Sequence, residues 1–142
     1  MTTVLAVDLG SASGRVLAGT LTDGRLDVTD IHRFKHEARR RADGTLTWDV
    51  ATMEAETIIG LKKALEQFPD AKTVSIDTWG VDWAPLDDNG ELVGDVIAYR
   101  DERTSRTLDA FRDRIADREF FDLTGNQPAT INTANQLFAF LR

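Results

Sequence analysis

The sequence of 142 residues contains no cysteine, only three prolines and no long run of apolar residues. Without cysteine the chain can form neither a disulfide scaffold nor a thiolate metal site, which is compatible with a reducing compartment. No segment reaches the length of a membrane span. The first residues, Met1-Thr2-Thr3, lack the basic flank of a signal peptide. We therefore expect a cytoplasmic protein with no membrane partner.

Positive charge is also scarce, because 17 lysines and arginines face 24 aspartates and glutamates, for a net charge of −7. Such a chain repels a nucleic-acid backbone unless its basic residues gather in one patch. The only candidate is Arg39-Arg40-Arg41, which we interpret as a solvated loop beside a turn at Asp43-Gly44. We expect no nucleic-acid partner.

The apolar pattern of the first half predicts an antiparallel meander of three strands followed by a helix. Asp23-Gly24 is a hairpin turn signal, and Asp49 is a suitable helix N-cap. Apolar residues three and four positions apart predict one buried helix face. The expected strands cover residues 4–9, 15–21 and 26–34, and the helix covers residues 50–68 with Ile58, Leu61, Leu65 and Phe68 on its buried face.

In the second half, a buried strand is predicted over residues 73–77, and it ends in an acid as the first strand does. A strand over residues 81–86 is predicted at a sheet edge or with a bend, because Pro85 cannot donate to a ladder. Helices are predicted over residues 104–115, with Thr104 as N-cap, and over residues 133–142. This order indicates an α/β domain whose mixed sheet opens with a three-strand antiparallel meander and is flanked by helices.

A first candidate site is the turn between the first two predicted strands, residues 8–15. Its two glycines let backbone N–H groups converge on an anion. Ser11 and Ser13 add hydroxyls, Arg15 adds a cation suited to phosphate oxygens, and Asp8 is placed to hold Mg²⁺. The alternative is an ordinary hairpin whose polar side chains satisfy local backbone groups, and the spacing leaves both open. A P-loop and a dinucleotide fingerprint are excluded, because the segment has no Gly-Lys-Ser/Thr and lies between two strands.

A second candidate site is the segment from Asp77 to Trp83, which holds two aspartates, two tryptophans and one glycine. Indole rings can stack on the C–H face of a sugar, carboxylates accept hydroxyl protons, and glycine permits close approach of the backbone. The alternative is that the tryptophans fill the core and the acids cap turns. The residues alone favour this alternative, since most buried aromatic side chains serve packing.

Two further features have structural interpretations. Charges alternate from Tyr99 to Thr104, which we interpret as ion pairs that shape a loop, with a rim that orders the sugar loop as the alternative. His32 and His36 have no evident third ligand, so we expect no zinc site.

These segments resemble the FGGY carbohydrate kinases, within the actin-like ATPase superfamily. The stretch Asp8-Leu9-Gly10-Ser11-Ala12-Ser13-Gly14-Arg15 is similar to the first phosphate loop of that family. Residues 31–34, 46–49, 75–82 and 98–104 are similar to the branch of the family that phosphorylates L-rhamnulose, and the resemblance extends from Val4 to about Leu137. It implies a ribonuclease H-like domain, with ATP and sugar bound between this domain and a second one.

The resemblance also implies a role for individual residues. The reaction would transfer the γ-phosphoryl group of ATP to the 1-hydroxyl of L-rhamnulose. Asp8 would help to position Mg²⁺, and Gly80 would line the sugar pocket with Trp79 and Asp82. The residues expected to bind the ATP phosphates are Ser11, Ala12, Ser13, Gly14 and Arg15.

The family's general base, an aspartate, and its adenosine contacts belong to the second domain. We therefore expect residues 1–142 to form an incomplete N-terminal domain, with its general base beyond Arg142 and negligible kinase activity alone. The loop has Ser11-Ala12 where relatives often show Ala-Ser, which keeps one small hydroxyl. The alternatives are a kinase for another ketose or polyol, such as L-fuculose or D-xylulose, and a non-catalytic ATP- or sugar-binding module.

Overall fold

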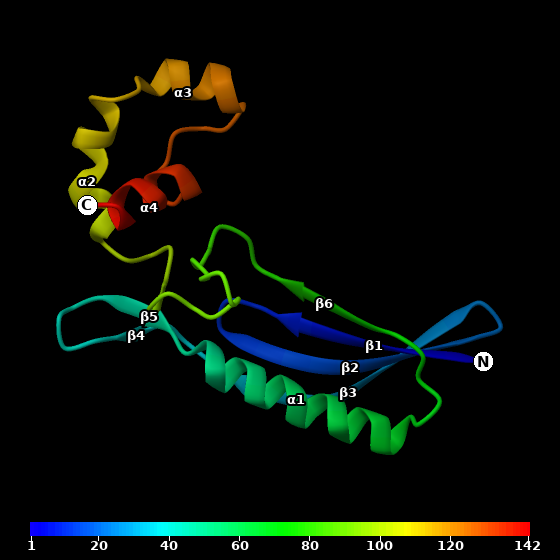
Figure 1. Ribbon diagram of the computed structural model, residues 1–142. Coiled ribbons are helices and arrows are strands. Elements are labelled where there is room, and N and C mark those ends of the chain that lie inside the picture. Colours follow the sequence, from blue (N-terminus) through cyan, green and yellow to red (C-terminus); the bar gives the residue numbers. More distant parts are fainter. The chain divides into compact units, whose positions relative to one another are not determined.

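The computed structural model describes residues 1–142, which fold into two compact units (Figure 1). Unit 1 comprises residues 1–38 and 49–80, and unit 2 comprises residues 39–48 and 81–142. The first candidate site lies in unit 1, whereas the second candidate site is divided after Gly80 between the two units. No helix of the structure combines the length and apolar character needed to cross a bilayer.

Unit 1 is built on a four-stranded mixed sheet with the strand order β3-β2-β1-β6. β1, β2 and β3 form an antiparallel meander, and β6 joins the sheet parallel to β1. This arrangement confirms the predicted meander and a strand near residues 73–77, but that strand was expected to be buried and is exposed along its length. The strands are β1 (Thr2–Leu9), β2 (Ser13–Thr22), β3 (Arg25–Lys35) and β6 (Val74–Thr78).

The hairpin between β2 and β3 is a two-residue turn, as Asp23-Gly24 predicted. Asp23 has φ 50° and Gly24 has φ 80°, the left-handed geometry that matches the twist of the flanking strands. The flanking pair is Thr22 and Arg25. The sequence therefore determines the register of this hairpin locally.

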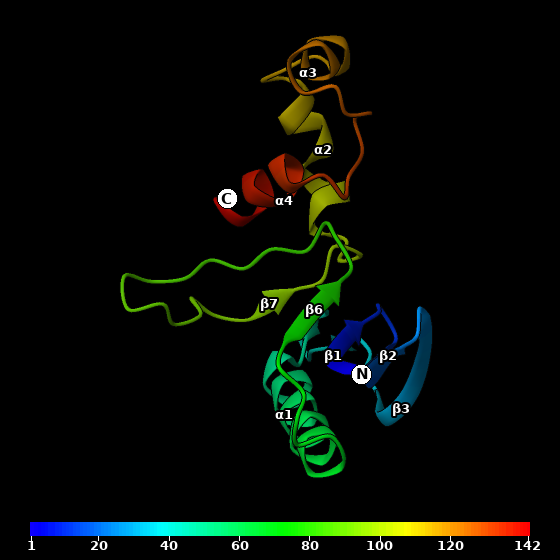
Figure 2. The ribbon, with the colours of Figure 1, turned by 90° about the vertical axis from the view of Figure 1, so that its right-hand side faces the viewer.

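One helix, α1 (Val50–Gln67), covers a face of the sheet in unit 1 (Figures 1 and 2). Asp49 caps it as predicted, because its Oδ1 atom accepts a hydrogen bond from the Thr52 N–H at 3.0 Å. Ala64 belongs to the core cluster beneath the helix. The other members of that cluster come from β1 and β2 and are Leu5, Val7, Val16 and Ala18.

The predicted buried face of α1 is partly wrong. Leu61 and Phe68 pack against the core, but Ile58 and Leu65 are 43% and 49% exposed. The buried helix residues are Met53, Thr57, Gly60 and Ala64. The helical period is therefore correct but the face is rotated, because α1 approaches the sheet closely through small residues: a Cβ on Gly60 would lie 3.1 Å from the Cβ of His32.

Unit 2 contains a small antiparallel sheet with the order β4-β5-β7 and three helices. Phe111 packs edge-to-face against Phe120 and Phe138, at 6.0 Å and 5.5 Å between ring centroids. These contacts join the three helices to each other. The elements are β4 (Arg39–Arg40), β5 (Leu46–Trp48), β7 (Val96–Ile97), α2 (Arg103–Arg112), α3 (Asp117–Thr124) and α4 (Thr133–Phe140).

The predicted strand over residues 81–86 is wrong, since only Leu86 forms an isolated bridge, with Leu92. Val81 has φ 72°, a left-handed conformation that is costly for a β-branched residue and incompatible with a strand. The buried Gln136 side chain donates to the Val81 carbonyl at 2.8 Å and helps to hold this conformation. Tertiary contacts from α4 thus override the local preference for a strand.

The start of α2 also differs from the prediction. Thr104 is not the N-cap but lies buried within the first turn of a helix that begins at Arg103. The Arg103 N–H donates to Asp101 Oδ1 at 2.9 Å, so Asp101 supplies the acceptor expected from Thr104. α3 was not predicted at all.

The basic run at residues 39–41 is exposed and partly forms β4, which pairs with β5 around the expected turn. Thr45 N–H donates to Asp43 Oδ1 at 2.9 Å, and Gly44 has φ 89°. The turn at Asp43-Gly44 is confirmed.

Candidate functional site

The predicted phosphate loop is the hairpin between β1 and β2 in unit 1. The Gly10 N–H donates to the Ser13 carbonyl at 3.0 Å, which closes the loop. Ser11 and Ala12 at its tip are exposed, whereas Ser13 and Arg15 are half-buried. The tip therefore presents backbone and one hydroxyl to solvent, as a phosphate ligand would require.

Gly14 serves packing rather than the turn. It lies buried in β2, and an added Cβ would overlap the Phe34 ring, with Phe34 Cε1 only 2.6 Å away. Neither Gly10 nor Gly14 has a positive φ. Backbone freedom was expected to be the reason for both glycines, but at Gly14 the reason is steric.

Arg15, Asp8 and Asp77 form a row across three adjacent strands. Asp8 pairs in register with Arg15 of β2 on one side and with Asp77 of β6 on the other. Arg15 Nη2 lies 2.9 Å from Asp8 Oδ2. The neighbouring pair, Val7 and Val16, faces the core, so alternation along the strands places the row on the opposite face of the sheet.

The carboxylates in this row fit a magnesium ion. Mg²⁺ prefers oxygen ligands and is usually held by one or two carboxylates together with waters and substrate phosphates. Asp8 and Asp77 end two neighbouring parallel strands, the edge at which ligands bind in α/β sheets. When bound, the ion would supply charge neutralisation for phosphate oxygens.

Asp77 was assigned to the sugar segment by the sequence analysis, and its position beside Asp8 was missed. The signal was present, because both predicted strands end in an aspartate. What the sequence could not provide was the pairing of β6 with β1, which joins segments about 70 residues apart.

Trp79 and Gly80 follow β6 at the same end of unit 1. The Trp79 ring stacks on His36, with 5.6 Å between ring centroids and 27° between the planes. Burial lowers the pKa of His36, and the nearby Gly10 backbone opposes part of that shift. Gly80 is exposed, and an added Cβ there would meet nothing within 4 Å.

Asp82 lies in unit 2, where both carboxylate oxygens hold the local fold. Oδ2 accepts from Trp48 Nε1 at 2.8 Å, and Oδ1 accepts from the Tyr99 N–H at 2.6 Å. Asp82 thus joins β5 to the segment after β7. Its assignment to the sugar pocket stays a prediction, and the structure adds a positioning role in unit 2.

Charged residues near 99–104 hold the local fold, chiefly through hydrogen bonds and not through the expected network of ion pairs. Asp101 Oδ2 accepts from the Leu46 N–H at 2.7 Å, and Arg103 Nη2 donates to Gln136 Oε1 at 3.3 Å. Burial lowers the pKa of Arg103, and the charges of Asp101 and Asp82 oppose this shift. This network ties α2 to β5 and α4 within unit 2.

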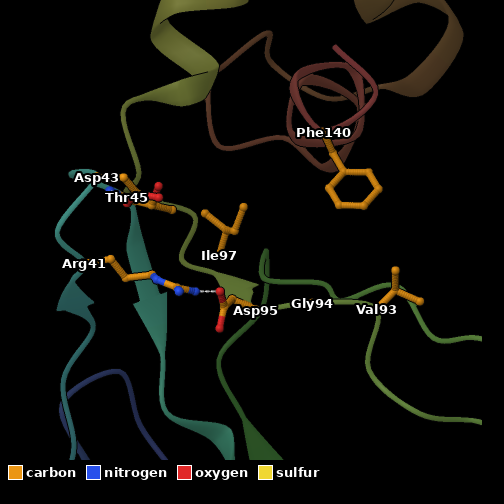
Figure 3. A pocket seen from close by; sticks show the side chains of 8 residues that line it. All are labelled: Arg41, Asp43, Thr45, Val93, Gly94, Asp95, Ile97 and Phe140. Atoms are coloured by element: carbon orange, nitrogen blue, oxygen red, sulfur yellow. Dashed lines mark hydrogen bonds and ion pairs between the residues drawn. The ribbon is translucent and has the colours of Figure 1, made fainter.

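Unit 2 also contains a separate pocket of about 230 Å³ between the β4–β5 turn, the segment before β7 and α4 (Figure 3). Arg41 forms an ion pair with Asp95, while Phe140 and Ile97 supply apolar surface. Asp95 compensates the Arg41 charge here, as Asp8 compensates the Arg15 charge beside the loop.

The fold is a ribonuclease H-like α/β domain. Solved sugar kinases share it: a ligand-bound xylulose kinase from Lactobacillus acidophilus matches 100% of this chain with a TM-score of 0.79 and 13% identity. A gluconate kinase from the same organism matches 99% of the chain with a TM-score of 0.78 and 13% identity. The chain covers 29% and 28% of these structures, and at this identity the likeness concerns the fold alone.

The sequence matches more specifically. Residues 3–141 match the N-terminal domain of the FGGY family of carbohydrate kinases, and the chain belongs to that family. Its curated relatives include the rhamnulokinases of Bacillus subtilis, 38% identical over 133 residues, and Klebsiella pneumoniae strain 342, 39% identical over 139 residues. The matches cover 94% and 96% of this chain but only 27% and 28% of the relatives.

Proposed function

We propose that the polypeptide containing this chain is an ATP-dependent sugar kinase that phosphorylates L-rhamnulose at its 1-hydroxyl. The γ-phosphoryl group would leave ADP as its P–O bond breaks, and the sugar oxygen would form the new P–O bond while its proton passes to a base. Membership of the FGGY family supports the reaction class. Identities of 35–39% to rhamnulokinases support the sugar.

The observation that carries the proposal is the position of the exposed loop tip beside Asp8 and Arg15. In phosphoryl transfer the protein contributes mainly alignment and charge neutralisation. Asp8 would hold Mg²⁺, and Arg15 would bind phosphate oxygens bidentately. The other proposed ATP ligands are the backbone and hydroxyl groups of Ser11, Ala12, Ser13 and Gly14.

The general base and the adenosine contacts are expected outside residues 1–142, as the family resemblance implies. The chain spans about 27–28% of the length of the curated relatives, which is consistent with a second domain that completes the site. We propose that residues 1–142 alone are inactive. Appreciable sugar-dependent ADP release by the purified chain would contradict this proposal. The cytoplasmic location stays a prediction.

The test of the function is ADP formation from Mg²⁺-ATP with a panel of ketoses, using the product of the whole reading frame that encodes this chain. We expect L-rhamnulose to be preferred over L-fuculose and D-xylulose, because a pocket matched to sugar hydroxyls discriminates sharply between analogues. Preference for another ketose would retain the kinase and discard the sugar assignment. Inactivity on every sugar would favour a non-catalytic module.

Gly80 provides a residue-level test of the sugar pocket. Gly80→Ala adds a Cβ into open space without a positive φ, so the fold should tolerate it. If Gly80 lines the pocket, the variant raises the KM for the sugar and leaves the KM for ATP unchanged. Gly19→Ala is the matched control, because the nearest atom to its Cβ would lie at an ordinary 3.4 Å, in a different part of unit 1. Unchanged sugar kinetics in Gly80→Ala would remove Gly80 from the pocket.

A further inference from the structure

His36, the residue after Lys35 at the end of β3, contacts both candidate binding elements of unit 1. Its backbone N–H donates to the Ala12 carbonyl at 3.3 Å, which attaches it to the tip of the phosphate loop. Its imidazole stacks on Trp79, which follows β6 and belongs to the proposed sugar pocket. One residue thus contacts two segments that are more than 60 residues apart in the sequence, the loop through its backbone and Trp79 through its ring.

The imidazole ring is held by further contacts. Its centroid lies 5.9 Å from that of the Phe34 ring, and both of its nitrogens are shielded from solvent. Phe34 in turn packs where a side chain on Gly14 would lie. The ring therefore contacts Phe34 of β3 and Trp79, while the backbone of the same residue is bonded to the loop.

We propose that His36 is a positioning residue that holds Trp79 in a fixed relation to the phosphate loop, so that sugar and ATP bind cooperatively. This inference rests on the proposed kinase function. The loop tip at Ser11 and Ala12 is exposed, and Trp79 follows an exposed edge strand. Neither element is embedded in the core, so a shared contact is an effective way to order both before the substrates bind.

A contact shared by two sites has a measurable thermodynamic consequence. If ordering of the loop by ATP also orders Trp79, ATP raises the affinity for the sugar, and the sugar raises the affinity for ATP by the same factor. Residues that only stabilise the fold would change the fraction of active protein without changing this factor.

Three variants of the whole gene product separate the aromatic ring from its polar atoms. His36→Phe keeps an aromatic ring for Trp79 but removes the ring nitrogens. His36→Gln keeps a polar group but removes the ring, and His36→Ala removes both. His32→Phe is the matched control, because His32 lies in β3, four residues before His36, and contacts Glu56 and Lys63 of α1 instead of the loop.

We expect His36→Ala to raise the KM values for sugar and for ATP together, by about five- to tenfold. His36→Gln should raise both values in the same way, because it also loses the ring, whereas His36→Phe keeps the ring and should raise neither. His32→Phe should change neither value. If His36→Ala and His36→Gln lower kcat alone, or if they match His32→Phe, the positioning role is wrong.

Tryptophan fluorescence gives a readout that does not depend on turnover. Mg²⁺-ATP should change the emission of the wild-type protein, and the change should be lost in Trp79→Phe and in His36→Ala but retained in His32→Phe. If the wild type phosphorylates no sugar, the proposed function fails, and this emission change still decides the inference. An ATP-dependent change that persists in His36→Ala, or the absence of any change in the wild type, would overturn it.

Discussion

The Nη2 atom of Arg15 lies 2.9 Å from Oδ2 of Asp8, and the two residues are register partners across β1 and β2. Their side chains are 37% and 40% exposed, so both remain accessible. In the structure the proposed phosphate ligand is thus paired with the proposed metal ligand. Binding of Mg²⁺-ATP would exchange this ion pair for two new ones, Asp8 with the metal and Arg15 with the phosphates.

We first predict that Asp8→Asn abolishes most kinase activity without unfolding the protein. An exposed ion pair contributes under about 1 kcal/mol to stability, whereas loss of charge at a phosphoryl-transfer site costs about 100-fold or more in kcat. The measurements are ADP release over a Mg²⁺ titration and the melting temperature. Asp27→Asn is the control, because Asp27 forms an exposed ion pair with Arg25 in the next hairpin. Equal activities of Asp8→Asn and Asp27→Asn would contradict the metal-binding role of Asp8.

A second prediction concerns the buried glycine that supports the loop. Gly14→Ala would push a Cβ into the Phe34 ring and should destabilise the protein by about 1–3 kcal/mol, as other overpacked cores are destabilised. Gly19→Ala on the same strand has room and should have little effect. Thermal unfolding of both variants provides the comparison. Equal melting temperatures would show that the Phe34 side chain moves aside without cost.

Local chemistry in the sequence was sufficient to predict much of unit 1. The Asp23-Gly24 turn, the Asp49 cap and the strand pattern each depend on residues close in sequence, and each is confirmed. The rotation of the α1 face was not predictable in this way. It depends on the close approach of Gly60 to Val16 and His32. Hydrophobicity alone would instead predict that the larger Ile58 and Leu65 are buried.

In the candidate site too, local features were predictable from the sequence and long-range contacts were not. The composition of the loop and the two strands that end in aspartate were visible in the sequence. The Asp8–Asp77 adjacency, the His36–Trp79 stack and the bonds of Asp82 all require long-range pairing. The strand predicted near Val81 failed for that reason too, since the backbone there is held by Gln136 from α4.

Asp82 allows a third prediction, that its carboxylate is needed for folding as well as for any contact with sugar. In Asp82→Asn, an NH₂ group would face either Trp48 Nε1 or the Tyr99 N–H, and one donor would lose its acceptor. Such a loss costs about 1–3 kcal/mol, so the melting temperature should fall. The control is Asp88→Asn, because Asp88 is exposed in the same region. A sugar KM that rises without any loss of stability would contradict this assignment and leave Asp82 as a substrate ligand only.

The fourth prediction is a dependence of stability on pH that arises at His36. Its pKa in the folded protein is lowered, first by burial, with the nearby Gly10 backbone opposing the shift. The unfolded chain, with an ordinary histidine pKa of about 6.5, therefore binds a proton more readily than the folded chain. The contribution of neutral His36 is fully present above that value and is lost as the pH falls through the lower pKa of the folded state. His36→Phe, which cannot be protonated, should reduce the loss of melting temperature between about pH 7.5 and about pH 5.5. His32→Phe retains His36 and should keep the wild-type loss. If His36→Phe loses as much stability as the wild type over this range, the burial of the imidazole is not what disfavours its protonation.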